Sequence, residues 1–535
     1  MTAYFCSVVR NFSGPHDRLH NMNTLLERIM SVAGILASVS ACGKDEGAGD
    51  APDRDEIPVE RPVELVTDSY TAYPSGANAC ADSYLTLKFA SEPQLGSSGR
   101  IRIIGGDGTV ADMIDMSDVS AGRQQMTDRT PFNTAMDAVG SSYTGYYRIV
   151  WYDPVYVDGN TVTIRLHSDK LEYEGTYSVE IDEGVIVADG FGGIEAGEWT
   201  FSVMPRPEDD SRVTVGSRNC DFMTVQGAVN FACSCGQSRE VTVAVSEGVY
   251  REPLYIRSKN NLTIEGEGRD RTIIMFDNCN DYSDGVGSGV KTVPEPGEPV
   301  GSAGGRSVVL VENCDMLHFR NISVENTHGH GSQAETVYFN SNDGRMTAVG
   351  CNFTGEQDTL ELKGWCLFRS CTVTGDVDFI WGYAKAALFE SCEIRSCENA
   401  NGGYVVQARC ASGDRGFVFL NCELTAESGV EDGSVWLARS GGSASYYDNV
   451  TYVNCRMGDH IADAGWYGSP SPNPSSAAGG NGWKEYGSLD ISGAAADLSA
   501  RYPRSSVISS AEYESLYRDA AAVFSDCPHG ISWAE

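Results

Sequence analysis

Positive charge is scarce in this sequence. Its 535 residues include 39 lysines and arginines against 74 aspartates and glutamates, which gives a formal net charge of −35. Such a surface repels phosphate backbones, so we expect no nucleic-acid partner. Histidine is scarce too, because only eight are present and none has metal-ligand spacing to cysteines or carboxylates. We therefore predict no metal site and no cofactor.

The apolar run near the N-terminus, residues 29–39, is too short to cross a membrane. Arg28 precedes it and small residues follow, which is typical of a signal peptide. The segment VSAC (39–42) resembles a bacterial lipobox, whose cysteine is lipidated after cleavage. We predict a signal peptide with a lipobox over residues 1–42 and a lipid on Cys42, with Met22 as a second candidate start. The alternative is an ordinary cleaved signal with an incidental cysteine.

Residues 43–62 have too little apolar character to build a core. Their glycine, proline and acidic residues predict a flexible acidic tether. The segment KDE (44–46) resembles export signals of surface-displayed lipoproteins in some Gram-negative bacteria. We therefore expect an outer-membrane lipoprotein of the cell envelope, exposed on the surface. Its contact with the membrane would be through the lipid anchor only, and we expect a monomer.

Residues 63–204 alternate apolar and polar residues in short runs, and the chain as a whole is expected to be all-β. Abundant glycine (59) and tyrosine (25) favour short strands and tight turns over long helices. Such runs occur at 84–89, 100–104, 161–166, 177–181 and 199–203. The alternation predicts an antiparallel β-sandwich. It resembles bacterial Ig-like domains found beside secreted enzymes, either as a spacer or as a carbohydrate-binding module, and residues 205–213 would be a linker.

A short theme that ends in cysteine recurs from residue 212 onward. Its copies are VENC (311–314), AVGC (348–351), FRSC (368–371), FESC (389–392), FLNC (419–422) and YVNC (452–455). The closest copies are 20 and 21 residues apart, and loops stretch the other intervals. This period predicts the coils of a parallel β-helix over residues 214–535. Because cysteine is small and readily buried, we expect an internal ladder of mostly free thiols rather than disulfides.

Two loop insertions and one helical segment complete the C-terminal domain. The composition of residues 277–306 and 468–482 predicts long loops, which on a solenoid often build the binding groove. Residues 510–524 have helical character, and we expect them to cover the C-terminal end of the solenoid.

Two segments carry the chemistry: GEQDTL (355–360) and GDVDFIWG (375–382). With DFMTVQGA (221–228), EGVYRE (247–252) and a late Gly-Trp (465–466), they make residues 215–530 similar to the pectin methylesterase family of carbohydrate esterases. That resemblance implies a right-handed parallel β-helix. It also implies hydrolysis of the C6 methyl esters of galacturonan, so that methyl-esterified pectin is the expected polysaccharide substrate.

Asp358 and Asp378 are 20 residues apart, which is one short coil. On a parallel sheet this spacing places both carboxylates on one face, about 5 Å apart. Two close carboxylates titrate separately, so one keeps its proton and serves as an acid while the other is ionised and can attack.

The family resemblance assigns the roles. It implies that Asp378 is the nucleophile, that Asp358 is the general acid and then the base, and that Gln357 lies in the oxyanion hole. Gln333, in the segment SQAETV (332–337), matches a second active-site glutamine. Arg439 matches the arginine of the family's LGRPW motif, which binds substrate and keeps the nucleophile ionised.

The sequence departs from that motif after Arg439, where LARSG (437–441) lacks the family's proline and tryptophan. Trp381 and Trp436 are candidates for the missing substrate-binding aromatic surface, with core packing as the alternative for both. The departure leaves acetyl esters and unusual pectins open as substrates. Two other functions stay open: a β-helical glycoside hydrolase on galacturonan, supported by a short GHG segment (329–331), and a catalytically inactive, glycan-binding surface lipoprotein.

Overall fold

The structure is a computed structural model that describes residues 61–535, apart from 124, 127–129, 302, 478–479 and 535. The described residues belong to one unit that runs from Glu60 to Glu535. The predicted signal peptide, Cys42 and nearly all of the tether lie outside the described residues. In the described part of the chain, no helix is both long enough and apolar enough to cross a bilayer.

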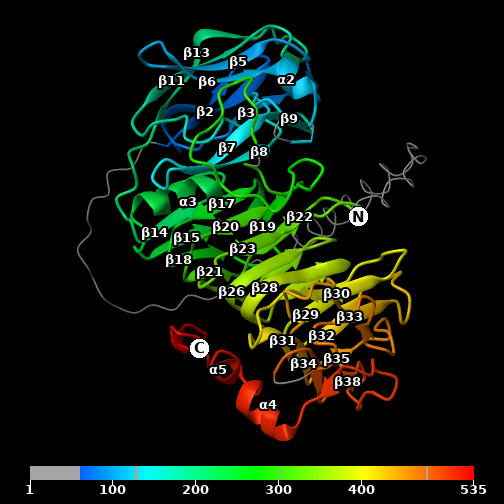
Figure 1. The fold of residues 1–535 in the computed structure, drawn as a ribbon. Helices are drawn as coiled ribbons and strands as arrows, with labels where there is room; N and C mark the ends of the chain where they lie inside the picture. Colours follow the sequence, from blue (N-terminus) through cyan, green and yellow to red (C-terminus); the bar gives the residue numbers. More distant parts are fainter. Residues whose placement is uncertain (1–60, 124, 127–129, 302, 478–479, 535) are drawn as a thin grey trace, which may run out of the picture. The chain divides into compact units, whose positions relative to one another are not determined.

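The N-terminal domain, residues 63–203, consists of short strands (Figure 1). Its main sheet contains β1 (Val63–Val66), β2 (Tyr70–Ala79), β3 (Leu85–Phe89), β5 (Arg100–Gly105), β6 (Val110–Asp115), β9 (Val155–Asp158), β10 (Thr161–Ile164), β11 (Thr176–Ile181) and β13 (Ile194–Val203). Two smaller pairs are β4 (Gln94–Leu95) with β12 (Ile186–Val187), and β7 (Met136–Ser141) with β8 (Tyr146–Trp151). A short helix, α2 (Met116–Ser120), follows β6.

Alternating side chains explain the strands of this domain. In β3, Leu85, Leu87 and Phe89 are buried in a core that also contains Ile101 and Trp199 from other strands. The five predicted runs coincide with β3, β5, β10, β11 and β13. The pairing is not wholly antiparallel, because β2 is antiparallel to β3 and parallel to β13. The resemblance to Ig-like domains stays a prediction.

The C-terminal domain is a parallel β-helix with three faces, which confirms the predicted fold class. The first face contains β17 (Leu254–Arg257), β20 (Val309–Glu312), β23 (Val337–Asn340), the first halves of β26 (Leu360–Arg369) and β28 (Val377–Glu390), β30 (Gly403–Ala408), β33 (Val435–Arg439) and β36 (Trp466–Tyr467). We call it the site face, since both predicted catalytic aspartates lie on it or at its edge.

The other two faces complete each coil. One contains β14 (Arg212–Val215), β15 (Val241–Val245), β18 (Leu262–Gly266), β21 (Leu317–Arg320), β24 (Arg345–Val349), the second halves of β26 and β28, β31 (Gly416–Leu420), β34 (Val450–Val453), β37 (Trp483–Tyr486) and β39 (Ser506–Val507). The other contains β16 (Gly248–Arg251), β19 (Thr272–Phe276), β22 (Ser323–Asn326), β25 (Asn352–Thr354), β27 (Thr372–Gly375), β29 (Glu393–Ser396), β32 (Glu423–Ala426), β35 (Arg456–Met457) and β38 (Leu489–Asp490).

The cysteine repeat marks one corner of each coil. The residue before each cysteine has a positive φ, between 51° and 64°, and is Asn313, Gly350, Ser370, Ser391, Asn421 or Asn454. Glycine and asparagine are the residues that tolerate this left-handed conformation best, which explains much of the repeated pattern. The six cysteines that follow are buried, free thiols, so that part of the thiol prediction is confirmed.

Aromatic residues stack between the coils in the same repeat. The rings of Phe368, Phe389, Phe419 and Tyr452 stack in succession, with centroid distances of 4.6, 4.9 and 4.5 Å. Each ring begins one copy of the repeat, so equivalent residues lie above one another in successive coils. This column gives the solenoid a continuous core and fixes the register on which the site depends.

The helices of the domain lie at its first coils and on one flank, and the C-terminal ones differ from our expectation. α3 (Val225–Ser234) packs its buried face on the first coils, and Thr224 caps it by accepting a hydrogen bond from the Gly227 N–H. The last strand is followed by three short helices: α4 (Ser510–Leu516), α5 (Ala520–Val523) and the 3-10 helix η1 (Ser532–Ala534). This C-terminal segment packs on the flank formed by β26, β28, β31 and β34 instead of covering the end of the solenoid. The reason is an apolar outer surface there, which Phe524 and Trp533 cover.

Candidate active site

Three carboxylates occupy equivalent positions in successive coils of the site face. The register pairs Val337 with Leu360, and Leu360 with Ile380. Glu335, Asp358 and Asp378 each stand two residues before these positions. Since paired strands are about 4.8 Å apart, the three side chains form one row, which we call the carboxylate row. The sequence indicated two members of this row and missed Glu335.

Both aspartates of the row have a left-handed backbone. Their φ angles are 68° at Asp358 and 48° at Asp378. Residues other than glycine adopt this region rarely, although aspartate tolerates it better than most. Backbone conformations of this kind concentrate at functional sites, where the surrounding structure holds them in place. The coil stacking does so here, because the Asp358 N–H donates to the Val377 carbonyl oxygen at 3.0 Å.

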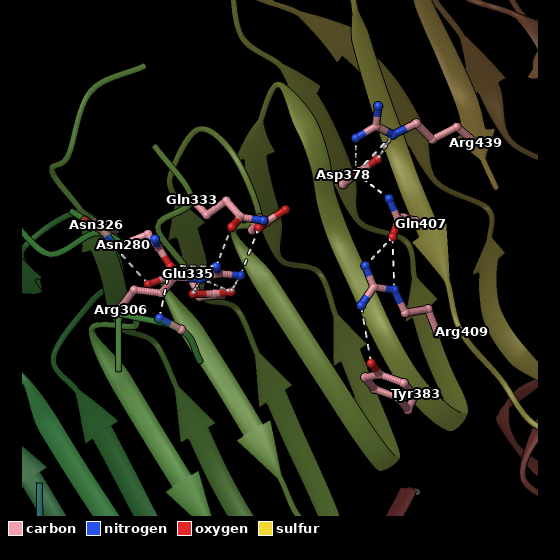
Figure 2. Close-up of polar contacts among 12 residues, drawn as sticks. Asn280, Arg306, Asn326, Gln333, Glu335, Asp378, Tyr383, Gln407, Arg409 and Arg439 are labelled. Carbon is pink, nitrogen blue, oxygen red and sulfur yellow. Dashed lines mark hydrogen bonds and ion pairs between the residues drawn. The ribbon is translucent and has the colours of Figure 1, made fainter. Parts of the chain in front are cut away.

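Asp378 is buried and is held by donors from two side chains. Arg439 approaches it with Nε, which lies 2.8 Å from Oδ1 and 3.0 Å from Oδ2, and with Nη2. Gln407 donates from Nε2 to Oδ2 at 2.7 Å. Figure 2 shows Asp378 between these two side chains. The predicted proximity of Arg439 and Asp378, which are 61 residues apart, is therefore present in the structure.

Asp358 is equally buried, with 4% exposure, but has a different partner. Its Oδ2 accepts a hydrogen bond from Nη2 of Arg306 at 3.2 Å. Arg306 makes a closer, bidentate ion pair with Glu335, with Nε and Nη2 at 2.9 and 2.7 Å from Oε1. Most of the arginine's charge is therefore engaged by Glu335, and Asp358 receives the weaker contact.

The two aspartates differ in how their surroundings act on the proton. Burial raises the pKa of Asp378, while hydrogen bonding and the charge of Arg439 oppose that rise. Burial raises the pKa of Asp358 well above its usual range, and the charge of Glu335 raises it further. Arg306 opposes this effect only in part. Asp358 is therefore the member whose surroundings favour the protonated form more strongly, and Asp378 is the member whose charge is stabilised by a cation.

Arg306 also fixes the orientation of Gln333. Its Nη1 donates to Oε1 of Gln333 at 2.5 Å. A guanidinium has donors only, so the amide atom that it contacts must be the oxygen. The amide nitrogen of Gln333, an exposed residue, is then directed away from Arg306 and is available as a donor to a ligand. Figure 2 shows Gln333 beside Arg306 and Glu335.

Gln357 lies directly before Asp358 and is half-buried. Its backbone carbonyl accepts a hydrogen bond from the Ala334 N–H at 3.2 Å, which ties it to the coil that contains Gln333. No hydrogen bond of its side chain occurs among the described residues. The amide is therefore free to donate to a ligand at the carboxylate row.

A second arginine orients the second amide at the site. Nε and Nη2 of Arg409 lie 3.0 and 2.6 Å from Oε1 of Gln407, so the Gln407 nitrogen must face Asp378. Nη1 of Arg409 lies 3.3 Å from the Tyr383 hydroxyl, and its guanidinium covers the Trp381 ring at 4.6 Å. The hydrogen bonds from Tyr383 through Arg409 and Gln407 to Asp378 appear in Figure 2 as a chain.

The two candidate tryptophans have different surroundings. Trp381 is 6% exposed and lies under Arg409. Trp436 is half-buried and stacks on Tyr404 at 5.4 Å, with Tyr467 at its edge at 5.1 Å. Arg439 lies 4.4 Å from the centroid of the Tyr404 ring, so this aromatic cluster continues directly from the partner of Asp378. A substrate-binding role for either tryptophan stays a prediction.

One histidine lies near two carboxylates beside the carboxylate row. Ligand atoms of His330, Glu356 and Asp376 lie within 4.8 Å of one another, an arrangement that could hold a metal ion. Nδ1 of His330 is 2.6 Å from Oδ2 of Asp376 and 3.6 Å from Oε2 of Glu356. Sequence spacing did not indicate this group because its members come from three coils. The absence of a metal stays a prediction.

Four residues of the site were not indicated by the sequence motifs: Arg306, Glu335, Gln407 and Arg409. Two of them could have been found from the coil register, because Glu335 is equivalent to Asp358, and Gln407 pairs with Trp381 in the next coil. Arg306 stands at the end of a segment that composition identified only as a loop. Its position near Asp358 depends on how that loop folds.

Comparison with known proteins gives one family. The family model described as Pectinesterase matches residues 212–502. "Probable pectinesterase 8" of Arabidopsis thaliana is 31% identical over 296 residues, which is 53% of this chain and 67% of the relative. "Probable pectinesterase A" of Aspergillus niger is 32% identical over 257 residues, 48% of this chain and 72% of the relative. A solved pectin methylesterase from Aspergillus niger is 27% identical, has a TM-score of 0.45, and is matched over 57% of this chain and 92% of that one.

Proposed function

Since the chain belongs to the pectinesterase family, we propose that its β-helix hydrolyses the C6 methyl esters of galacturonan in pectin to pectate and methanol. The enzyme is then a carboxylic ester hydrolase. The observation that carries the proposal is the asymmetric carboxylate row, in which Arg439 pairs with Asp378 while burial and the charge of Glu335 raise the pKa of Asp358.

The first half of the reaction uses both aspartates. The carboxylate of Asp378 attacks the C6 carbonyl carbon and forms a tetrahedral intermediate with a negative oxygen. When this intermediate collapses, the C6–O bond to the methoxy group breaks, and Asp358 gives its proton to the leaving oxygen. Methanol departs, and the galacturonosyl carbonyl is joined to Asp378 as an acyl-enzyme.

The second half restores the enzyme. Asp358, now ionised, takes a proton from a water molecule, whose oxygen attacks the C6 carbonyl carbon. The bond to Asp378 breaks, and the product leaves as a free galacturonate carboxyl group. Asp378 is again a carboxylate and Asp358 is again protonated, so one water has been consumed for each methanol released.

The amides of Gln333 and Gln357 support the proposed oxyanion hole. Charge develops on the C6 carbonyl oxygen in both halves of the reaction, and fixed donors stabilise such charge strongly in a site shielded from water. Arg306 fixes the direction of the Gln333 amide, and Gln357 has no competing hydrogen bond among the described residues. Gln357 directly precedes Asp358, the middle member of the carboxylate row, and Gln333 shares Arg306 with Asp358.

Methanol release from methyl-esterified pectin tests the proposal. The purified protein should release methanol, and Asp378→Asn should lower kcat by about three orders of magnitude or more. Asp358→Asn should also lose activity, whereas Asp343→Asn, which changes an exposed carboxylate in the turn between β23 and β24, should retain it. Release of reducing ends without methanol would favour a glycoside hydrolase. Tight pectin binding without methanol release would favour an inactive glycan-binding protein. Methanol release by Asp378→Asn at the wild-type rate would refute the mechanism.

The cellular location is a separate proposal that rests on the sequence VSAC at residues 39–42. A lipid on Cys42 would hold the enzyme at the outer membrane, with the acidic segment 43–62 as its tether. Palmitate labelling of the full chain should mark the wild type and not Cys42→Ala. Protease treatment of intact cells should release the enzyme, and release only after lysis would refute surface exposure.

A further inference from the structure

The β7–β8 hairpin of the N-terminal domain packs directly on the esterase domain. Its residues Val139 and Val150 form one apolar cluster with Tyr255, Leu310 and Tyr338 of the site face. The backbone of β8 also pairs with the loop 277–306, because Tyr147 and Val290 exchange two hydrogen bonds of 2.8 Å. The hairpin therefore touches the solenoid at the same loop that ends in Arg306.

Arg148 lies on the face of β8 that Val150 also occupies, and it is fully buried with 0% exposure. All of its side-chain hydrogen bonds go to main-chain carbonyl oxygens of the esterase domain. Nη2 contacts the carbonyl oxygens of Gly305, at 2.7 Å, and Ser307. Nη1 contacts those of Leu254 and Val308, each at 3.2 Å.

Two of these carbonyls flank Arg306 in the chain. Gly305 and Ser307 are its neighbours on either side. The Gly305 carbonyl belongs to the peptide group that precedes Arg306, and the Ser307 carbonyl to the peptide group one residue beyond it, so Arg148 holds the chain before and after Arg306. Val308, two residues after Arg306, donates its N–H to the Glu335 carbonyl oxygen at 2.9 Å. Arg148 thus contacts the backbone on both sides of Arg306, and one of the residues that it contacts, Val308, is hydrogen-bonded to the backbone of Glu335.

Arg306 in turn contacts Asp358 of the carboxylate row and the neighbouring Gln333. It donates to Oε1 of Gln333 and to Oδ2 of Asp358. A displacement of its backbone by a fraction of an ångström would lengthen both contacts together. Asn278 donates to the carbonyl oxygens of Gly305 and Ser307 at 2.8 and 3.0 Å, so the turn retains one donor when Arg148 is removed.

We propose that Arg148 of the N-terminal domain is a positioning residue of the esterase site, which acts through residues 305–308 and Arg306 on Gln333 and Asp358. The N-terminal domain is then part of the catalytic unit and not only a spacer. The inference rests on the proposed esterase function for its kinetic consequences, but its structural content does not.

The burial of Arg148 supports a dedicated role. Removing a guanidinium from water is costly unless its donors are satisfied. Here backbone carbonyls accept from Nη1 and Nη2 in place of a carboxylate, while the buried Nε has no hydrogen-bond partner among the described residues. Such an arrangement holds the segment 305–308 at three carbonyl oxygens and the solenoid at a fourth, that of Leu254, which an apolar residue of similar size could not do. If position 148 only had to fill space, a methionine side chain of similar size would do so as well as arginine.

The test uses the full chain with Arg148→Met and Arg148→Lys. For Arg148→Met we expect kcat for methanol release to fall about tenfold or more with little change in KM, because the substrate still binds while the oxyanion donor and Asp358 are misplaced. Arg148→Lys keeps a charge and some donors, so its kcat should lie between the two. Arg102→Met is the matched control, since Arg102 pairs with Asp182 inside the N-terminal domain.

A double-mutant cycle separates positioning from general stability. If Arg148 acts through Arg306, then Arg148→Met should lower kcat much less in an Arg306→Met background than in the wild type. Hydrogen exchange gives a readout without activity: the backbone amides of 305–308 and 333–335 should exchange faster in Arg148→Met and not in Arg102→Met. All variants are assayed at a temperature where each is folded, and Arg148→Lys carries the test if Arg148→Met does not fold.

Each outcome has a distinct meaning. A wild-type chain that releases no methanol would refute the proposed function alone. Unchanged exchange at 305–308 and 333–335, in Arg148→Met or in the lysine variant that replaces it, would refute the inference whether or not the enzyme is active. Multiplicative losses of kcat in the double mutant would also refute it, because they would mean that Arg148 and Arg306 act independently.

Discussion

Asp358 and Asp378 stand in equivalent positions of neighbouring coils, and both have a positive backbone φ, 68° and 48°. The coil register brings the two carboxylates together, and their partners make them chemically different. Arg439 holds Asp378 with two donors, whereas Asp358 shares Arg306 with Glu335. Two residues of the same type, in the same backbone conformation, can therefore serve as nucleophile and acid.

Removal of the arginine at Asp378 should shift the acid side of the pH profile. Arg439 lowers the pKa of Asp378 against the effect of burial, and Asp378 must be ionised to attack. In Arg439→Met the pKa of Asp378 rises, so Asp378 becomes protonated, and activity falls, at a higher pH than in the wild type. The kcat/KM profile for methanol release should show its acid limb moved upward together with a lower maximum. Arg395→Met, which removes an exposed pair with Glu393, should leave the limb in place.

Neutralising Glu335 should shift the basic side of the profile in the opposite direction. The charge of Glu335 raises the pKa of Asp358, and Asp358 must be protonated to release methanol. In Glu335→Gln this pKa falls, partly because Arg306 then turns its full charge to Asp358. The basic limb of kcat should therefore move to lower pH. Glu423→Gln at an exposed position is the control, and an upward move of the limb would contradict the assignment of the acid.

Arg409 should matter through Gln407, although it does not touch Asp378 in the structure. Arg409→Met removes the donors that hold Oε1 of Gln407, so the amide can turn its oxygen toward the carboxylate. We expect kcat to fall about tenfold, with a smaller further loss when Gln407→Ala is added. Equal and independent losses in the two single variants would show that Arg409 acts by another route.

The aromatic column should contribute strongly to stability without affecting chemistry. Phe389 stacks between Phe368 and Phe419 in the core, so Phe389→Ala should lower the free energy of unfolding by about 3–5 kcal/mol. Phe389→Leu should cost less because it fills more of the space. Urea unfolding measures both, and Tyr143→Ala, at a residue 69% exposed, is the control. Under conditions where Phe389→Leu is folded, its kcat for methanol release should equal that of the wild type.

Much of the fold could be predicted because its determinants are local and repeated. The copies of the repeat that end at Cys371 and Cys392 are 21 residues apart, so the coil period is visible in the sequence. The strand runs of the N-terminal domain were visible in the same way. The position of residues 510–524 was not, because it depends on which outer surface of the solenoid remains apolar after folding.

The sequence by itself determined the coil period, and with it the pairing of Asp358 and Asp378, because stacking makes residues one coil apart neighbours in space. Only the tertiary structure decided which charges surround them. Arg306 and Arg148 reach the site through a loop and a hairpin whose contacts span 52 and as many as 160 residues. No periodic pattern relates positions so far apart, so their contribution depends on how the two domains pack against each other.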